Sequence, residues 1–159
     1  MRLEETLGPL LIARRLTLAV AESCTGGHLA NLITNVPGAS AVLLAGVVSY
    51  SNEAKQDFLG VSPETLAAHG AVSAEVAREM AEGARQRTGA TYGLALTGIA
   101  GPSGGTAAKP VGTVFVALAG PRPTRVEHYL NPLDRLTFKQ VSSNQALELL
   151  RRAVELGEV

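Results

Sequence analysis

The sequence has little of several residue types, and each shortage argues against a class of function. Its one cysteine, Cys24, leaves no intrachain disulfide and no cysteine-rich zinc site. Tryptophan is absent, and three phenylalanines and three tyrosines would supply few platforms for stacking nucleic-acid bases. Fourteen basic residues balance fourteen acidic ones, so the charge surplus that binds a nucleic-acid backbone is also missing.

Long apolar runs and targeting signals are missing as well. The longest apolar run, 39–48, is shorter than the ~20 residues of a membrane span and contains Ser40 and Gly46. The N-terminus carries Glu4 and Glu5, unlike a signal peptide. The sequence has no His-x-x-x-His pair, no cysteine pair and no dense carboxylate cluster. We therefore expect a cytoplasmic protein that binds neither membrane nor nucleic acid and uses no metal or other cofactor.

Apolar residues and glycine are plentiful. The 159 residues fall within the ~100–200 of a single domain, and the 46% hydrophobic content is that of a globular protein. We therefore expect one domain over residues 1–159. The 17 glycines are about half as many again as the usual share of ~7% would give. Six of them lie at Gly26, Gly27 and within 98–105, a clustering typical of backbone that approaches a ligand or adopts positive φ.

Strand-like and helix-like segments alternate along the chain. Apolar and alternating runs predict strands over 16–21, 42–50, 92–96, 112–119 and 125–130. Helical spacing and capping residues predict helices over 3–14, 28–34, 52–59, from 63 after Ser62, from 74 after Ser73 to about 87, and over 133–156. The last helix should bury a side that contains or adjoins Leu136, Val141, Leu147 and Leu150. This order favours an α/β fold with helices on both faces of a largely parallel sheet, and a site beyond the carboxyl ends of its strands.

Ser23 follows the first predicted strand and precedes a Gly-Gly turn into a helix. There a hydroxyl can attack a ligand, with the amides of Thr25, Gly26 and Gly27 as donors to an oxyanion. Ser23 can equally be a helix N-cap. A Gly-x-Ser-x-Gly elbow does not fit, because the flanking positions are alanine and threonine. Cys24 is either an alternative nucleophile or a small buried side chain.

A serine nucleophile needs a base, and none of the three histidines has a good placement. Lys55 follows Tyr50 at the end of a predicted core strand. A desolvated lysine can lose its proton near neutral pH, and the tyrosine can relay that proton. The ordinary alternative is a solvated lysine on a helix.

The segment 97–106 is rich in glycine and follows a predicted strand. Backbone amides at Gly98 and Gly101 can cradle a phosphate, although the spacing matches neither a P-loop nor Gly-x-Gly-x-x-Gly. The alternative is a tight structural turn. Arg135, at the start of the last predicted helix, can either clamp a phosphate or lie on the surface.

Six blocks in order resemble the C-terminal domain of the competence/damage-inducible protein CinA family, over nearly the whole chain. They are Ala-Glu-Ser-Cys-Thr-Gly-Gly (21–27), Pro-Gly-Ala-Ser (37–40), Tyr-Ser-Asn-Glu-Ala-Lys (50–55), His-Gly-Ala-Val-Ser (69–73), Thr-Gly-Ile-Ala-Gly-Pro (97–102) and Lys-Pro-Val-Gly-Thr-Val (109–114). The resemblance implies a three-layer α/β/α sandwich with a largely parallel or mixed sheet, and a homodimer. Stand-alone members are nicotinamide-nucleotide amidases, which convert nicotinamide mononucleotide to nicotinate mononucleotide and ammonia in pyridine-nucleotide salvage.

The resemblance also implies roles for individual residues. Ser23 corresponds to the nucleophile, and Tyr50 and Lys55 to the residues that assist it. The remaining matches, all substrate-binding, are Ser40, Thr97 and Arg135. Arg135 lies in Leu-Asp-Arg where the family has Gly-Asp-Arg, and Lys139 is a second basic candidate for the phosphate. Two other functions stay open: a non-catalytic nucleotide-binding module, and an interaction subunit that would expose a large apolar patch.

Overall fold

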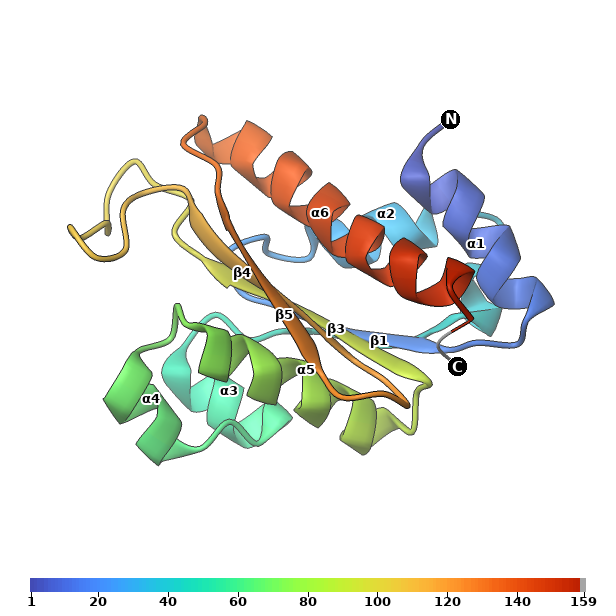
Figure 1. The fold of residues 1–159 in the computed structure, drawn as a ribbon, viewed down its shortest axis with the longest axis horizontal. Helices are drawn as coiled ribbons and strands as arrows, with labels where there is room; N and C mark the ends of the chain where they lie inside the picture. The colour runs from blue at the N-terminus through green and yellow to red at the C-terminus, as the bar shows by residue number, and fades with distance from the viewer. Residues whose placement is uncertain (158–159) are drawn as a thin grey trace.

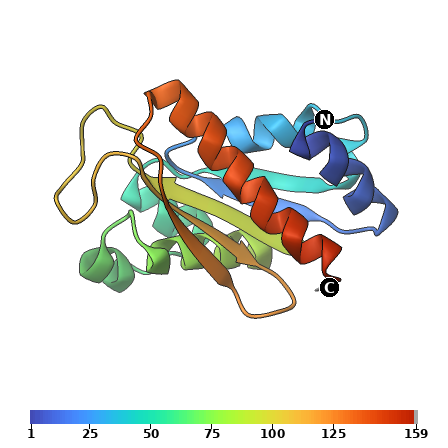
Figure 2. The ribbon, with the colours of Figure 1, turned by 45° about the horizontal axis from the view of Figure 1, so that its top comes forward.

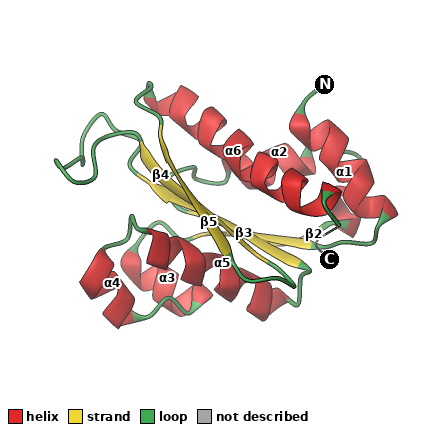
Figure 3. Ribbon diagram, viewed as in Figure 1, coloured by secondary structure: helices red, strands yellow, loops and turns green. Residues whose placement is uncertain are grey.

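The computed structural model describes residues 1–157, which form a five-stranded sheet between two layers of helices (Figures 1 and 3). The strand order is β2-β1-β3-β4-β5. The strands are β1 (Leu18–Glu22), β2 (Leu43–Val48), β3 (Tyr92–Gly98), β4 (Thr113–Ala119) and β5 (Arg125–Leu130). Strand β1 is parallel to β2 and β3, whereas β4 is antiparallel to β3 and β5. The expected α/β sandwich with a mixed sheet is confirmed; the expected domain end, residue 159, lies outside the described residues.

The helices divide into two layers, one on each face of the sheet. One layer contains α1 (Leu3–Ala13), α2 (His28–Thr34) and α6 (Arg135–Glu155), and the other contains α3 (Asn52–Leu59), α4 (Pro63–His69) and α5 (Ala74–Thr88). Figure 2 shows α6 lying across the sheet beside α1 and α2. A short 3-10 helix, Ala39–Ala41, precedes β2.

The sequence of β1 explains why the two faces have different cores. Side chains alternate along a strand, so Leu18 and Val20 enter the core shared with α1, α2 and α6, whereas Ala19 and Ala21 face α5. The small alanines let α5 pack close to the sheet. Gly83 of α5 then meets α3, where an added Cβ would stand 1.8 Å from the Leu59 carbonyl oxygen. Only glycine permits that approach.

The expected strands and helices are all present, and their ends differ from the predicted ones by a few residues. Ser62 and Ser73 cap α4 and α5 as expected, each accepting the amide three residues on. One predicted core residue is wrong: Leu136 is 71% exposed, because the buried side of α6 begins at Phe138. Within residues 1–157, no helix combines the length and the apolar character that a membrane crossing requires.

Candidate active site

A cleft lies where β1, β2 and β3 end, as the site was expected to. Its volume is about 270 Å³. Segments that are far apart in the sequence supply its lining: Ser23, Cys24, Tyr50, Asn52, Lys55, Ala71, Val72, the residues 97–101, Ser103, Gly104 and Arg135. The topology therefore brings together most of the predicted site residues at one edge of the sheet.

Ser23 and Lys55 meet in this cleft although 32 positions separate them. Helix α3 begins after Ser51, whose hydroxyl accepts the Ala54 amide and starts the helix at the end of β2. The first turn of α3 then carries Lys55 back under the sheet edge, where it is only 1% exposed. Its Nζ lies 3.1 Å from Ser23 Oγ and 2.7 Å from the Ser49 carbonyl oxygen. Lys55 is therefore not a solvated helix lysine.

Burial lowers the pKa of Lys55 below its ordinary value of 10.5, and this effect outweighs the electrostatic influence of Cys24, which raises the pKa. Within the described residues no carboxylate forms an ion pair with Lys55. A neutral Lys55 amine can donate one N–H to the Ser49 carbonyl and keep its lone pair for the Ser23 hydroxyl proton. The pair is thus arranged for a serine to be deprotonated by an amine.

In the turn from Ser23 to α2, one of the three backbone amides expected to bind an oxyanion already donates a hydrogen bond within the chain. The Gly26 amide donates to the Ser23 carbonyl at 3.1 Å, with φ of 61° at Gly26 and 101° at Gly27. The Thr25 hydroxyl donates to Glu22 and is buried. Thr25, Gly26 and Gly27 do not line the cleft. The amides of Thr25 and Gly27 form no hydrogen bond with the described residues, and they are the two of the predicted three that stay available.

Tyr50 does not contact Ser23 or Lys55 through its hydroxyl. Its side chain is 62% exposed, and its hydroxyl accepts a hydrogen bond from Arg135 at 3.1 Å. A second Arg135 nitrogen donates to the Gly101 carbonyl at 2.7 Å. Arg135 therefore joins the end of β2 to the glycine-rich loop across the cleft, and a proton relay through Tyr50 requires the tyrosine to move.

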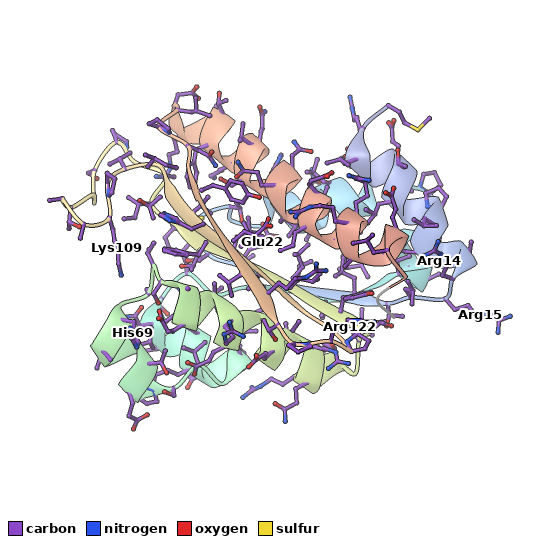
Figure 4. The ribbon with its side chains drawn as sticks, in the orientation of Figure 1. Arg14, Arg15, Glu22, His69, Lys109 and Arg122 are labelled. Carbon is purple, nitrogen blue, oxygen red and sulfur yellow. The ribbon has the colours of Figure 1, made fainter. Side chains whose placement is uncertain are left out.

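The glycine-rich loop between β3 and β4 extends beyond the sheet (Figure 1). Gly101 adopts φ of 79°, and an added Cβ there would stand 2.3 Å from Val111. The loop is also tied to the α4 layer, because Lys109 donates to the His69 carbonyl at 2.6 Å (Figure 4). The end of β3 is tied there too, because the buried Thr97 hydroxyl donates to the Ala71 carbonyl at 2.8 Å. These ties hold Gly98 and its neighbours against the cleft.

Two other predicted substrate-binding positions lie outside the cleft of the single chain. Ser40 is exposed in the 3-10 helix that precedes β2, whereas the cleft follows β2, so the length of that strand separates them. Lys139 does not line the cleft but lies beside the Ser23 turn, with Nζ 3.7 Å from where a Gly26 Cβ would stand. Of the two basic candidates, Arg135 alone lines the cleft.

Two residues that hold the site were missed in the sequence. Glu22 is 1% exposed at the end of β1, and Ser49 is fully buried beyond the end of β2. A carboxylate that ends an otherwise apolar strand is an unusual pattern, and this could have singled out Glu22. Ser49 contacts Lys55 through its backbone carbonyl, so its residue type gives no signal for that contact. No three His, Cys, Asp or Glu side chains of residues 1–157 group closely enough to hold a metal.

Cys24 is expected to resist thiol reagents in the folded protein. Burial raises the pKa of this thiol to about 12, and the charge of Glu22 adds to that increase. At pH 8 only about one thiol in 10⁴ would be ionised. Iodoacetamide should therefore modify Cys24, followed by intact mass, only after denaturation. Rapid labelling of the native protein at pH 8 would instead favour a cysteine nucleophile.

Comparison with known proteins agrees with the fold and the motifs. Residues 1–154 match the CinA C-terminal domain family. A CinA-like protein of Desulfosudis oleivorans is 53% identical over 96% of the chain, and one of Anaeromyxobacter is 57% identical over 91%. The chain spans 37% and 35% of the lengths of these two relatives.

Solved structures of similar proteins extend over the same region. The competence damage-inducible protein A of Klebsiella pneumoniae has a TM-score of 0.92 and 37% identity, covering 96% of this chain and 95% of its own. The competence/damage inducible protein CihA of Agrobacterium tumefaciens has a TM-score of 0.86 and 41% identity, covering 98% and 97%. The sequence similarity and the shared fold thus span almost the entire chain.

Proposed function

The chain belongs to the CinA C-terminal domain family, and from this premise we propose that it hydrolyses the carboxamide of nicotinamide mononucleotide to nicotinate mononucleotide and ammonia. The observation that carries the proposal is the buried Lys55 amine within hydrogen-bond distance of Ser23 at the floor of a cleft. The proposal also includes a single amidase domain over 1–159, a cytoplasmic location and a homodimer.

In the proposed reaction Ser23 Oγ attacks the carboxamide carbon while Lys55 takes the hydroxyl proton. Thr25 and Gly27 do not line the cleft, but their amides belong to the turn that follows Ser23, and they are the proposed donors to the oxygen that becomes negative. Such an interaction is worth about 3–4 kcal/mol of barrier per donor. Protonated Lys55 then gives its proton to the departing amine, which leaves as ammonia. Water adds to the acyl-enzyme with Lys55 again as base, releasing the carboxylate and restoring Ser23.

The remaining lining of the cleft suits the nucleotide part of the substrate. Arg135 offers guanidinium N–H groups beside the glycine-rich loop, a combination that recognises phosphate. The exposed Tyr50 ring stands at the same mouth and offers an apolar face to a pyridine ring.

The experiment that tests the function is release of ammonia from nicotinamide mononucleotide by the purified chain. Nicotinamide riboside, which lacks the phosphate, is the matched control and should be turned over far less efficiently. Binding of the mononucleotide without ammonia release would show a nucleotide-binding module instead of an amidase. If the chain neither binds the mononucleotide nor releases ammonia from it, the interaction-subunit alternative would remain.

Replacing Arg135 with alanine is expected to raise KM for the mononucleotide about tenfold, with a smaller change in kcat, because a charged hydrogen-bond donor to phosphate would be lost. Lys139→Ala should have a smaller effect, since Lys139 does not line the cleft. Arg122→Ala, at the far end of the sheet from Lys109 (Figure 4), is the charge-matched control and should leave KM unchanged. A larger increase in KM for Lys139→Ala than for Arg135→Ala would indicate that the phosphate binds beside the Ser23 turn instead.

A further inference from the structure

Glu22 is a carboxylate without solvent contact in the centre of the molecule (Figure 4). It is the last residue of β1 and immediately precedes Ser23. Oε1 accepts the Thr25 hydroxyl at 2.6 Å and the Leu29 amide at 2.9 Å, and Oε2 accepts the Ala30 amide at 3.0 Å. Three donors thus surround a charge that would otherwise be costly to bury.

These contacts replace a cap that α2 does not have. The residue at the N-cap position of α2 is Gly27, which has no side chain to accept the first amides of the helix. Leu29 and Ala30 are the second and third residues of α2, and their amides point to Glu22 instead. The positive end of the helix also favours a negative group at this place.

These hydrogen bonds close the segment 22–30 into a loop, and Ser23 is one of the residues of that loop. Glu22 also holds the other side of the reacting pair, through its backbone. The Glu22 carbonyl accepts the Ser49 amide at 2.8 Å and the Ser49 hydroxyl at 3.3 Å. The Ser49 carbonyl in turn accepts Lys55 Nζ. Glu22 is therefore connected to Ser23 along the chain and to Lys55 through Ser49.

We propose that Glu22 is a positioning residue for the nucleophile: its carboxylate fixes the turn that carries Ser23 and so sets the distance from Ser23 Oγ to Lys55 Nζ. The inference rests on the proposed roles of Ser23 and Lys55, but not on the identity of the substrate. Misplacement of a reacting group by about 1 Å can cost about 100-fold in rate, so the geometry of this turn should govern reactivity.

The test uses Glu22→Gln, which keeps the shape of the side chain but turns an amide group toward one of the amide or hydroxyl donors. Ser62→Ala is the matched control, because it removes the cap of α4, away from the cleft. A fluorophosphonate probe reports reactivity of Ser23 without any substrate. The bond from Ser23 Oγ to phosphorus forms, the phosphorus–fluorine bond breaks, fluoride leaves and Lys55 takes the proton. Intact mass follows labelling, and thermal melting follows stability.

Glu22→Gln is expected to be labelled at least about tenfold more slowly than the wild type, and to lower kcat more than it changes KM. Ser62→Ala should melt at a lower temperature yet be labelled at the wild-type rate. A second variant, Thr25→Val, removes one donor and keeps the carboxylate. It should give an intermediate labelling rate, and it carries the test if Glu22→Gln does not fold.

Wild-type labelling of Glu22→Gln, or of Thr25→Val where only that variant folds, would overturn the proposal and leave the carboxylate a purely structural cap. Failure of the wild type itself to be labelled would overturn it together with the proposed nucleophile. Labelling of the wild type without ammonia release would refute the proposed substrate alone, while slower labelling of the variants would still support the role of Glu22.

Discussion

Replacement of Ser23 with alanine is expected to lower kcat for ammonia release by about 10³-fold or more, because the proposed nucleophile is removed. The variant should keep its fold, because within residues 1–157 the Ser23 hydroxyl forms a hydrogen bond with Lys55 alone, and Lys55 retains the Ser49 carbonyl. Binding of nicotinamide mononucleotide, measured by calorimetry, should change little, because the phosphate contacts lie elsewhere in the cleft.

The matched serine control for this experiment is Ser62→Ala, which removes the hydroxyl of a half-buried serine at the N-cap of α4 and should leave kcat unchanged. Turnover by Ser23→Ala within tenfold of the wild type would show that Ser23 does not attack the amide, which would leave a water molecule or Cys24 as the nucleophile. If water attacks, Lys55 would remain as its base.

Replacement of Lys55 with methionine is expected to lower kcat by a similar factor, because no other amine or imidazole lines the cleft among the described residues. Methionine matches the length of the lysine stem, so the packing of α3 should be retained. In the wild type, kcat/KM should rise with pH through the lowered pKa of Lys55, since the neutral amine is the active form. The methionine variant should lose that rise along with most of its activity.

The stability of the wild type and that of Lys55→Met should also depend differently on pH. The pKa of Lys55 is lower in the folded chain than its ordinary 10.5, so between the two values the unfolded chain binds a proton that the folded chain lacks. The free energy of unfolding of the wild type therefore rises with pH in this window, and the full cost of the buried charge is present below it. Denaturant titrations of Lys55→Met should show no such rise. An equal rise in both proteins would assign it to another group.

Much of this architecture is encoded locally, and the sequence therefore predicts it. Apolar runs followed by polar turns placed the strands, and serines such as Ser62 and Ser73 placed helix starts to within a residue. The rule that parallel strands present their carboxyl ends at one edge was enough to bring Ser23 and Lys55 to the same cleft.

The remainder depends on contacts between distant segments, which local patterns do not contain. Leu136 has an apolar side chain at helical spacing, yet in the first turn of α6 it is Phe138 that is buried, and Leu136 is 71% exposed. The Arg135 bridge from Tyr50 to Gly101 joins three segments through a hydroxyl and a backbone carbonyl, and neither acceptor has a sequence signature. For the same reason the resemblance alone does not explain Ser40, which lies just before the start of β2, whereas the cleft lies beyond the end of that strand.

The two reacting groups come from opposite sides of the sheet, since the turn of Ser23 leads into α2 and Lys55 belongs to α3. A partly folded chain, with only one helical layer docked, would hold an inert hydroxyl and a hydrated ammonium. If the proposed function is correct, a nascent or damaged molecule would be harmless to other amides in the cell, because the proposed reacting pair forms only when both helical layers have docked.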